Sequence, residues 1–193
     1  MKELVFASNN ANKLRELREL LDGKYMVLSL SDIGCHDDIP EESDSFEGNA
    51  LGKALWVKER YGYDCFADDS GLEVFALGGE PGIYSARYAG CDHDSAANNA
   101  KLLERLENIN DRRARFRTAI ALVCGDKQPI FFNGYVDGEI LKEEHGAVGF
   151  GYDPLFRPDG WDKTFAEASP EEKNAVSHRG MAVRKLVAYL EAK

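Results

Sequence analysis

Short apolar runs alternate with amphipathic stretches from the start of the chain. Residues 4–7, Leu-Val-Phe-Ala, form an unbroken apolar run that is typical of a buried strand. A polar turn at 8–12 follows, and leucines then recur at helical spacing until Gly23 ends the pattern. Because the N–H groups at a helix N-terminus point back toward such a turn, this strand, turn and helix together predict an anion-binding site.

Three later stretches also carry apolar residues at the spacing of one buried helical face. They predict helices over about 45–60, from 94 or 95 to about 109, and over about 177–191. Asp44 and Glu47 have the spacing of a capping box for the first of these helices.

Runs of strand-forming residues lie between the predicted helices. They predict strands at 65–67 and 72–77, separated by the turn-forming sequence Asp68-Asp69-Ser70-Gly71. Two longer runs, 116–124 and 129–136, flank a short turn-forming segment and predict an antiparallel hairpin. Strands interspersed with helices in this way predict a mixed α/β fold.

The composition is that of an ordinary globular protein, with 193 residues, 44% of them hydrophobic and 30% charged. This length fits one domain, or two lobes that share one sheet, and we treat residues 1–193 as a single domain. Acidic residues outnumber basic ones by 34 to 24, so the formal net charge is −10. We therefore expect no bulk attraction to nucleic acid or to an anionic membrane, and a polyanionic ligand must be met by local cations or a bound metal ion.

Apolar runs and cysteine usage bear on the location of the protein. No segment approaches the roughly 18 apolar residues of a membrane span. The run at 4–7 is also too short for the core of a signal peptide, which takes about 7 to 15 residues. The cysteines are widely spaced and form no CxxC pair, so we expect reduced thiols and no zinc site. These features predict a cytoplasmic protein.

Two lysines lie where they could meet an anion. Lys13, in the pattern Ser8-x-Asn10-x-x-Lys13, falls in the first turn of its helix, where a cation opposes the helix dipole by roughly 0.3–1 kcal/mol. A bound anion would reverse that cost; the alternative is that Ser8 or Asn10 is the N-cap and Lys13 a solvated lysine. Lys53 shares a helical face with Asn49, and its ammonium either reaches solvent or meets a phosphate.

Carboxylates gather at Asp68 and Asp69 and in the acidic, loop-like segment 31–44, which contains Glu41. Carboxylates at strand ends suit Mg²⁺, which takes one or two from a protein and keeps waters and substrate phosphates as its other ligands. One carboxylate near such a metal can also act as the general base for an attacking water. The alternative is a purely structural turn at 68–71.

Glycines and aromatic residues alternate at 149–152 and are followed by Asp153. Such a segment lets a backbone approach a flat ligand while a ring stacks on it, and a hydrophobic hairpin rim is the alternative. If Ser177 caps the last helix, His178 and Arg179 occupy its first turn, where cations are favoured only when they face an electron-rich group. An arginine donates hydrogen bonds and never accepts them, so it favours a purine that carries O6 over adenine.

Six motifs follow one another as in the inosine triphosphate pyrophosphatase family, which removes non-standard purine nucleotides. The chain resembles this family over nearly its whole length, and most closely its bacterial dITP/XTP pyrophosphatase branch. It departs from the family at Gly48, where Glu is more common, and at Ala168, where a larger apolar residue is usual. The motifs are Ser8-x-Asn10-x-x-Lys13-x-x-Glu16, Phe46-Glu47-x-Asn49-Ala50-x-x-Lys53-Ala54, Ala67-Asp68-Asp69-Ser70-Gly71-Leu72, Pro81-Gly82-Ile83-Tyr84-Ser85-Ala86-Arg87-Tyr88, Gly149-Phe150-Gly151-Tyr152-Asp153-Pro154-Leu155-Phe156 and Ser177-His178-Arg179.

The resemblance implies a two-lobed α/β fold with a long central mixed β-sheet flanked by helices, a nucleotide cleft between the lobes, and a homodimer. It implies Mg²⁺-dependent hydrolysis of ITP, dITP and XTP to the monophosphate and pyrophosphate. The site residues that it implies are catalytic Asp69, Asp68 and Lys13; phosphate-binding Ser8, Asn9, Asn10, Asn12, Lys13, Lys53 and Ser70; base-binding Phe150, Gly151, Tyr152, Asp153, Lys173, His178 and Arg179; and metal-binding Glu41 and Asp69. Either Asp69 or Asp68 is the general base.

Two other functions stay open. A pyrophosphatase similar to the septum-formation inhibitors would act on modified pyrimidine or 7-methylguanosine nucleotides, but the base-pocket motifs favour a purine. A nucleotide sensor would bind without hydrolysis. The presence of Glu41, Asp68 and Asp69 argues against it, because a sensor has no need of a site for metal and water.

Overall fold

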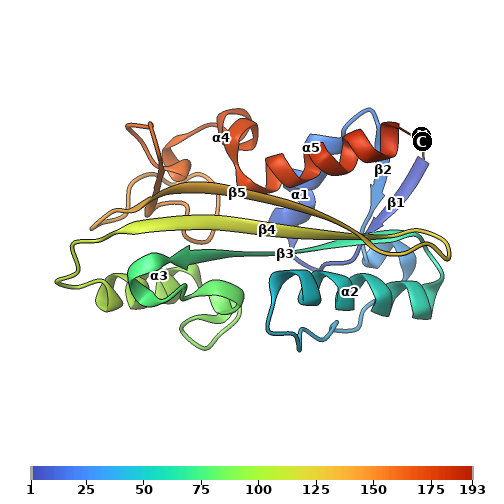
Figure 1. The fold of residues 1–193 in the computed structure, drawn as a ribbon, viewed down its shortest axis with the longest axis horizontal. Coiled ribbons are helices and arrows are strands. Elements are labelled where there is room, and N and C mark those ends of the chain that lie inside the picture. Colours follow the sequence, from blue (N-terminus) through green and yellow to red (C-terminus); the bar gives the residue numbers. More distant parts are fainter. Residues whose placement is uncertain (1, 193) are drawn as a thin grey trace. The chain divides into compact units, whose positions relative to one another are not determined.

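Six strands form one mixed sheet in the computed structural model, which describes residues 2–192 (Figure 1). Their order across the sheet is β2-β1-β3-β4-β5-β6. β1 runs parallel to β2 and β3, and β6 runs antiparallel to β5. The strands are β1 (Lys2–Phe6), β2 (Tyr25–Leu28), β3 (Cys65–Val74), β4 (Arg113–Val123), β5 (Ile130–Ile140) and β6 (Phe156–Pro158). This architecture confirms the predicted α/β class.

The described residues contain five α-helices, and the four predicted from apolar spacing are among them. None of the helices in this part of the chain is long and apolar enough to cross a membrane. The helices are α1 (Ala11–Leu21), α2 (Phe46–Tyr61), α3 (Ser95–Arg105), α4 (Pro170–Val176) and α5 (His178–Glu191). α3 ends earlier than the sequence predicted, although Leu106 beyond it is still buried.

The chain divides into two compact units. The described part of the first unit comprises residues 2–69, 118–134 and 180–192, and the second comprises residues 70–117 and 135–179. Strands β3, β4 and β5 contribute residues to both units. The unit boundary on β3 falls between Asp69 and Ser70, so the predicted site residues are shared between the two units.

In the first unit, side chains that alternate along β1 enter two different cores. Leu4 and Phe6 pack in one core with Leu17 of α1 and Leu186 of α5. Val5 lies in the other core, with Ala54 and Val57 of α2. The period-two alternation of a strand therefore places α1 and α5 on one face of this unit's strands and α2 on the other, as Figure 1 shows.

The second unit has its own aromatic core. Phe116 of β4 packs against Phe156 of β6 with ring centroids 4.6 Å apart, and Phe165 lies 5.4 Å from Phe156. Leu102 of α3 and Leu72 of β3 are fully buried in the same cluster. This core positions the segments that carry the predicted base-binding residues.

The turn predicted at Asp68–Gly71 is wrong, because β3 continues through it from Cys65 to Val74. The two aspartates are buried and have lysine and amide partners, so tertiary contacts override the turn propensity of the sequence. The end of the predicted strand 72–77 is also wrong, since Phe75–Leu77 is a short 3-10 segment. The hairpin is confirmed: β4 and β5 are neighbours, and residues 124–129 between them are too few for a parallel crossover.

The start of α2 differs from the predicted capping box. Ser45, not Asp44, is the N-cap, and its Oγ accepts the N–H of Gly48 at 3.0 Å. Sequence patterns also missed β2, β6 and α4. The signal for α4 was present, because Ser169 and Glu172 form a capping box around Pro170 at the first helical position.

Candidate functional site

The turn before α1 is organised by Asn10. Its Oδ1 accepts the N–H groups of Asn12 at 3.1 Å and Lys13 at 3.2 Å, and the Oγ of Ser8 accepts the N–H of Asn10 at 3.1 Å. Asn10 rather than Ser8 is therefore the N-cap. Asn9 next to it is exposed, so the turn presents polar side chains to solvent.

Lys13 is not a solvated surface lysine. Its Nζ lies 3.3 Å from Oδ1 of Asp68, whose side chain is fully buried. The lysine, in the first turn of α1, is thus held by a carboxylate of β3. The cost of a cation at a helix N-terminus is offset by this ion pair.

Lys53 of α2 reaches two further groups. Its Nζ donates to Oε1 of Glu41 and to the backbone carbonyl of Asp68, each at 2.7 Å. Burial lowers the pKa of this lysine, but the charges of Glu41, Asp68 and Asp69 outweigh that effect and raise its pKa overall. Lys53 is therefore a charged ammonium, 5% exposed, among three carboxylates.

Asp69 is a buried carboxylate with a raised pKa. Burial raises its pKa to about 6, against the opposing influence of Lys53, Lys13 and a hydrogen bond from Asn49. Nδ2 of Asn49 donates to Oδ2 of Asp69 at 3.0 Å. A carboxylate that titrates near neutrality is suited to proton transfer. We call Lys13, Glu41, Lys53, Asp68 and Asp69 the carboxylate–lysine cluster.

The donor set of this cluster fits a hard divalent cation only in part. Among residues 2–192, no group of three or more His, Cys, Asp and Glu side chains is arranged to hold a metal. Glu41 and Asp69 supply carboxylate oxygens, and Mg²⁺ commonly takes one or two of these and completes its shell with water and substrate phosphate. The residues present therefore fit a substrate-dependent Mg²⁺ better than a resident structural metal.

In the second unit, Asp153 organises the glycine-rich segment. Its Oδ2 accepts the Nζ of Lys173 at 2.7 Å and the N–H of Phe150 at 3.1 Å. Lys173 also lies 4.7 Å from the centre of the Phe150 ring, and the guanidinium of Arg179 lies 5.7 Å from the same ring. Nη2 of Arg179 is 3.4 Å from Oγ of Ser70. The structure therefore brings together these five predicted residues.

The remaining predicted base-binding residues are built into the core of the same unit. The ring of His178 stacks on Phe116 at a centroid distance of 4.8 Å and an interplanar angle of 9°. The hydroxyl of Tyr152 donates to the carbonyl of Ser85 at 2.7 Å, and burial raises the pKa of this phenol. Gly151 has a φ of 62°, a conformation that favours glycine.

Comparison with known proteins places the chain in a family. The model of the Ham1 family matches residues 4–189. The chain belongs to the Ham1 family. The predicted resemblance to dITP/XTP pyrophosphatases is also confirmed: a protein of that name from Flavobacterium johnsoniae is 53% identical over 190 residues, which is 98% of each chain.

Solved structures of the Ham1 family share the fold. The Staphylococcus aureus Ham1 protein matches with a TM-score of 0.90 and 44% identity over 99% of both chains. The nucleoside-triphosphatase / dITP/XTP pyrophosphatase from Mycobacterium abscessus matches with a TM-score of 0.78 and 44% identity, over 95% of this chain and 98% of that one.

Two asparagines of this Ham1 chain belong with the site, although the sequence did not assign them a role. Asn49 contacts Asp69 as described above, and Nδ2 of Asn99 on α3 donates to the carbonyl of Gly151 at 3.1 Å. Both are buried polar side chains, Asn49 on the same helix as the buried Lys53 and Asn99 beside the buried Asn98. A buried amide needs hydrogen-bond partners, so an asparagine at a predicted buried position of a helix was the available sign.

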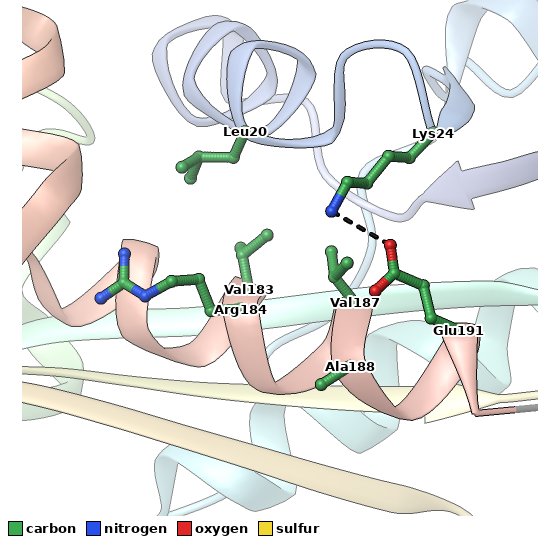
Figure 2. Close-up of a pocket in the computed structure, with 7 residues that line it drawn as sticks. All are labelled: Leu20, Lys24, Val183, Arg184, Val187, Ala188 and Glu191. Atoms are coloured by element: carbon green, nitrogen blue, oxygen red, sulfur yellow. Dashed lines mark ion pairs between the residues drawn. The ribbon is translucent and has the colours of Figure 1, made fainter.

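A hollow elsewhere in the first unit is not lined by any predicted site residue (Figure 2). Its volume is about 190 Å³, below the roughly 300–1,000 Å³ of typical small-molecule sites, so we assign it no ligand. An ion pair between Lys24 and Glu191, 3.0 Å long, lies at its rim. The lining residues are Leu20, Lys24, Val183, Arg184, Val187, Ala188 and Glu191.

Proposed function

We propose that this chain hydrolyses the non-standard purine nucleotides dITP, ITP and XTP to the monophosphate and pyrophosphate, and so removes them from the nucleotide pool. Relatives named dITP/XTP pyrophosphatase that match nearly the whole chain support this function. The observation that carries it is the carboxylate–lysine cluster. In it, Lys13 of α1 pairs with the carboxylate of Asp68 and Lys53 of α2 donates to the Asp68 carbonyl, next to the buried Asp69.

The cations of the first unit receive the triphosphate. Lys13 and Lys53 neutralise phosphate charge, and the polar turn supplies further hydrogen bonds. Both lysines are already positioned by Asp68, so little side-chain entropy is lost when a phosphate replaces water beside them. The other phosphate-binding residues of the proposal are Ser8, Asn9, Asn10, Asn12 and Ser70.

Asp69 is the general base of the proposed reaction. It takes a proton from the water whose oxygen forms a bond to the α-phosphorus, while the bond from that phosphorus to the pyrophosphate oxygen breaks. Asp68 is the less suited of the two, since its carboxylate is engaged by Lys13. Glu41 and Asp69 would hold Mg²⁺ with the substrate, and the ion when bound would supply positive charge to the phosphates.

Residues of the second unit hold the base in the proposal. The Phe150 ring offers a stacking surface, and Arg179 donates to an O6 acceptor but cannot accept from an amino group. Gly151, Tyr152, Asp153, Lys173 and His178 shape and position this pocket. Discrimination against adenine follows, because a donor facing the adenine amino group would be left without an acceptor.

Assembly and location are part of the proposal. We propose a cytoplasmic homodimer, on the family resemblance and on the cysteine and charge pattern. Light scattering of the purified protein measures its mass in solution, and a mass of one chain contradicts the dimer. Cell fractionation tests the location.

Hydrolysis in isotopically labelled water tests the proposed chemistry. Attack at the α-phosphorus places the label in the monophosphate and leaves pyrophosphate unlabelled. Label in pyrophosphate, or release of orthophosphate with a diphosphate, contradicts the proposal.

A further inference from the structure

Asn49 joins Asp69 to a segment that is distant in the sequence. Its side chain is 2% exposed, its Nδ2 donates to Oδ2 of Asp69 at 3.0 Å, and its Oδ1 accepts the backbone N–H of Ser43 at 2.9 Å. A backbone N–H can only donate, so the amide oxygen must face Ser43. The amide nitrogen then faces Asp69, and the orientation of the side chain is fixed by both contacts.

Gly48 gives Ser43 the room to make this contact. A Cβ at position 48 would lie 2.7 Å from Cβ of Ser43 and 2.8 Å from Oγ of Ser45. Cβ of Ser43 is bonded directly to the backbone, so a larger residue at position 48 must displace the backbone that donates to Asn49. In this chain, where Gly48 stands in place of the Glu more common in the family, the position of Ser43 therefore depends on the absence of a side chain at residue 48.

We propose that Asn49 is a positioning residue for the hydrolytic step, which holds the Asp69 carboxylate by Oδ2 and is itself oriented by Ser43 packed against Gly48. The inference rests on the proposed function, in which Asp69 takes the proton. The hydrogen bond from Asn49 uses one lone pair of Oδ2, and the other lone pairs of the carboxylate stay available for the water and the metal ion.

The same arrangement links Asp69 to Glu41. Ser43 lies two residues after Glu41, and Lys53, one helical turn beyond Asn49, donates to Glu41 and to the carbonyl of Asp68. Two side chains of α2 therefore tie the segment 41–43 to Asp68 and Asp69. Asn49 fixes the separation of the two carboxylates that are proposed to hold the metal.

Steady-state kinetics of Asn49→Ala and Gly48→Ala with dITP test the inference. For Asn49→Ala we expect kcat to fall about 10- to 100-fold, as is usual when a supporting hydrogen bond to a reacting group is removed. KM is expected to change less than about 3-fold, since Asn49 is not proposed to touch the nucleotide. Gly48→Ala should lower kcat in the same way although residue 49 is unchanged, and it keeps the test open if Asn49→Ala does not fold.

Gly52→Ala is the matched control for Gly48→Ala on the same helix. It adds a Cβ that meets no atom within 4 Å, so it should leave kcat near the wild-type value. A fall in kcat for Gly52→Ala that matches the fall for Gly48→Ala would overturn the inference, as would an unchanged kcat in Asn49→Ala.

Turnover by the wild-type protein distinguishes failure of the proposed function from failure of this inference. If the wild-type protein hydrolyses none of the nucleotides, the function is wrong, and crystal structures then test the positioning directly. The Asp69 side chain should keep one rotamer in the wild type and lose it in Asn49→Ala. An unchanged Asp69 rotamer in that variant overturns the inference whatever the activity.

Discussion

Lys53 and Glu41 form an ion pair of 2.7 Å in which the lysine is almost fully buried and the carboxylate is partly exposed. The same ammonium donates to the carbonyl of Asp68. One lysine thus supplies the positive charge that offsets several nearby carboxylates, and its pKa is raised for that reason despite its burial. The ion pair is therefore part of the fold as well as of the proposed phosphate site.

Lys53→Met is expected to destabilise the protein by about 3 kcal/mol at pH 8, because it leaves buried carboxylates without their counter-charge. The free energy of unfolding in urea measures the loss. Lys58→Met is the matched control on the same helix, since Lys58 pairs with the exposed Asp64 at 2.8 Å and such pairs contribute about 1 kcal/mol or less. A loss in Lys53→Met no greater than that in Lys58→Met would contradict the prediction, because the buried contacts of Lys53 would then contribute no more than an exposed ion pair.

Asp69→Asn is expected to stabilise the metal-free protein at pH 8. Burial raises the pKa of Asp69 from 3.8 to about 6, so stability falls as the pH rises between these values and the buried carboxylate ionises. At about 1.4 kcal/mol per pKa unit, the variant should gain at most about 3 kcal/mol at pH 8 and nothing below about pH 4. Unfolding in urea with a chelator present measures the free energy of unfolding of the variant and of the wild type, at pH 8 and below about pH 4. If Asp69→Asn is less stable than the wild type at pH 8, the Asp69 carboxylate does not have a raised pKa.

The same substitution is expected to abolish turnover while nucleotide binding is retained. An amide cannot accept the proton of the attacking water, and loss of a general base lowers kcat by roughly 10²- to 10⁴-fold. Calorimetric titration with dITP and pyrophosphate release measure the two properties separately. Near-wild-type activity would show that Asp69 is not the base and would direct attention to Asp68.

Arg179→Ala is expected to lower kcat/KM for ITP far more than for ATP. The arginine lies over the Phe150 ring and donates without accepting, so it serves only a base with an acceptor at O6. We expect a loss of roughly 10- to 100-fold for ITP. Equal losses for the two nucleotides would mean that Arg179 does not recognise the base.

Local patterns predicted most of the elements, because their causes lie within a few residues. Apolar spacing was sufficient for α1, α2, α3 and α5, and turn residues were sufficient for the β4–β5 hairpin. The prediction of a turn at Asp68–Gly71 failed for the opposite reason. The strand conformation of this segment depends on Lys13, Lys53 and Asn49, which are distant in the sequence. β2 was missed because four residues are too few for a clear period.

The candidate site was predictable in its residue types and not in its contacts. The order of the motifs along the chain was sufficient to predict Lys13, Lys53 and Asp68 as site residues. It did not predict that these side chains contact one another. The pattern left Asn49 without a role, since the bond to Ser43 depends on how the segment before α2 folds back over Gly48. Contacts of this kind depend on tertiary structure, which periodicity does not describe.

Pyrophosphate release with Mg²⁺ across ITP, dITP, XTP, GTP and ATP, together with a modified pyrimidine triphosphate, tests the central claim most directly. We predict strong preference for ITP, dITP and XTP, with the monophosphate as co-product. Binding of ITP with no turnover of any nucleotide would contradict the enzyme and indicate a sensor. Preferential turnover of the pyrimidine nucleotide would contradict the assigned base pocket.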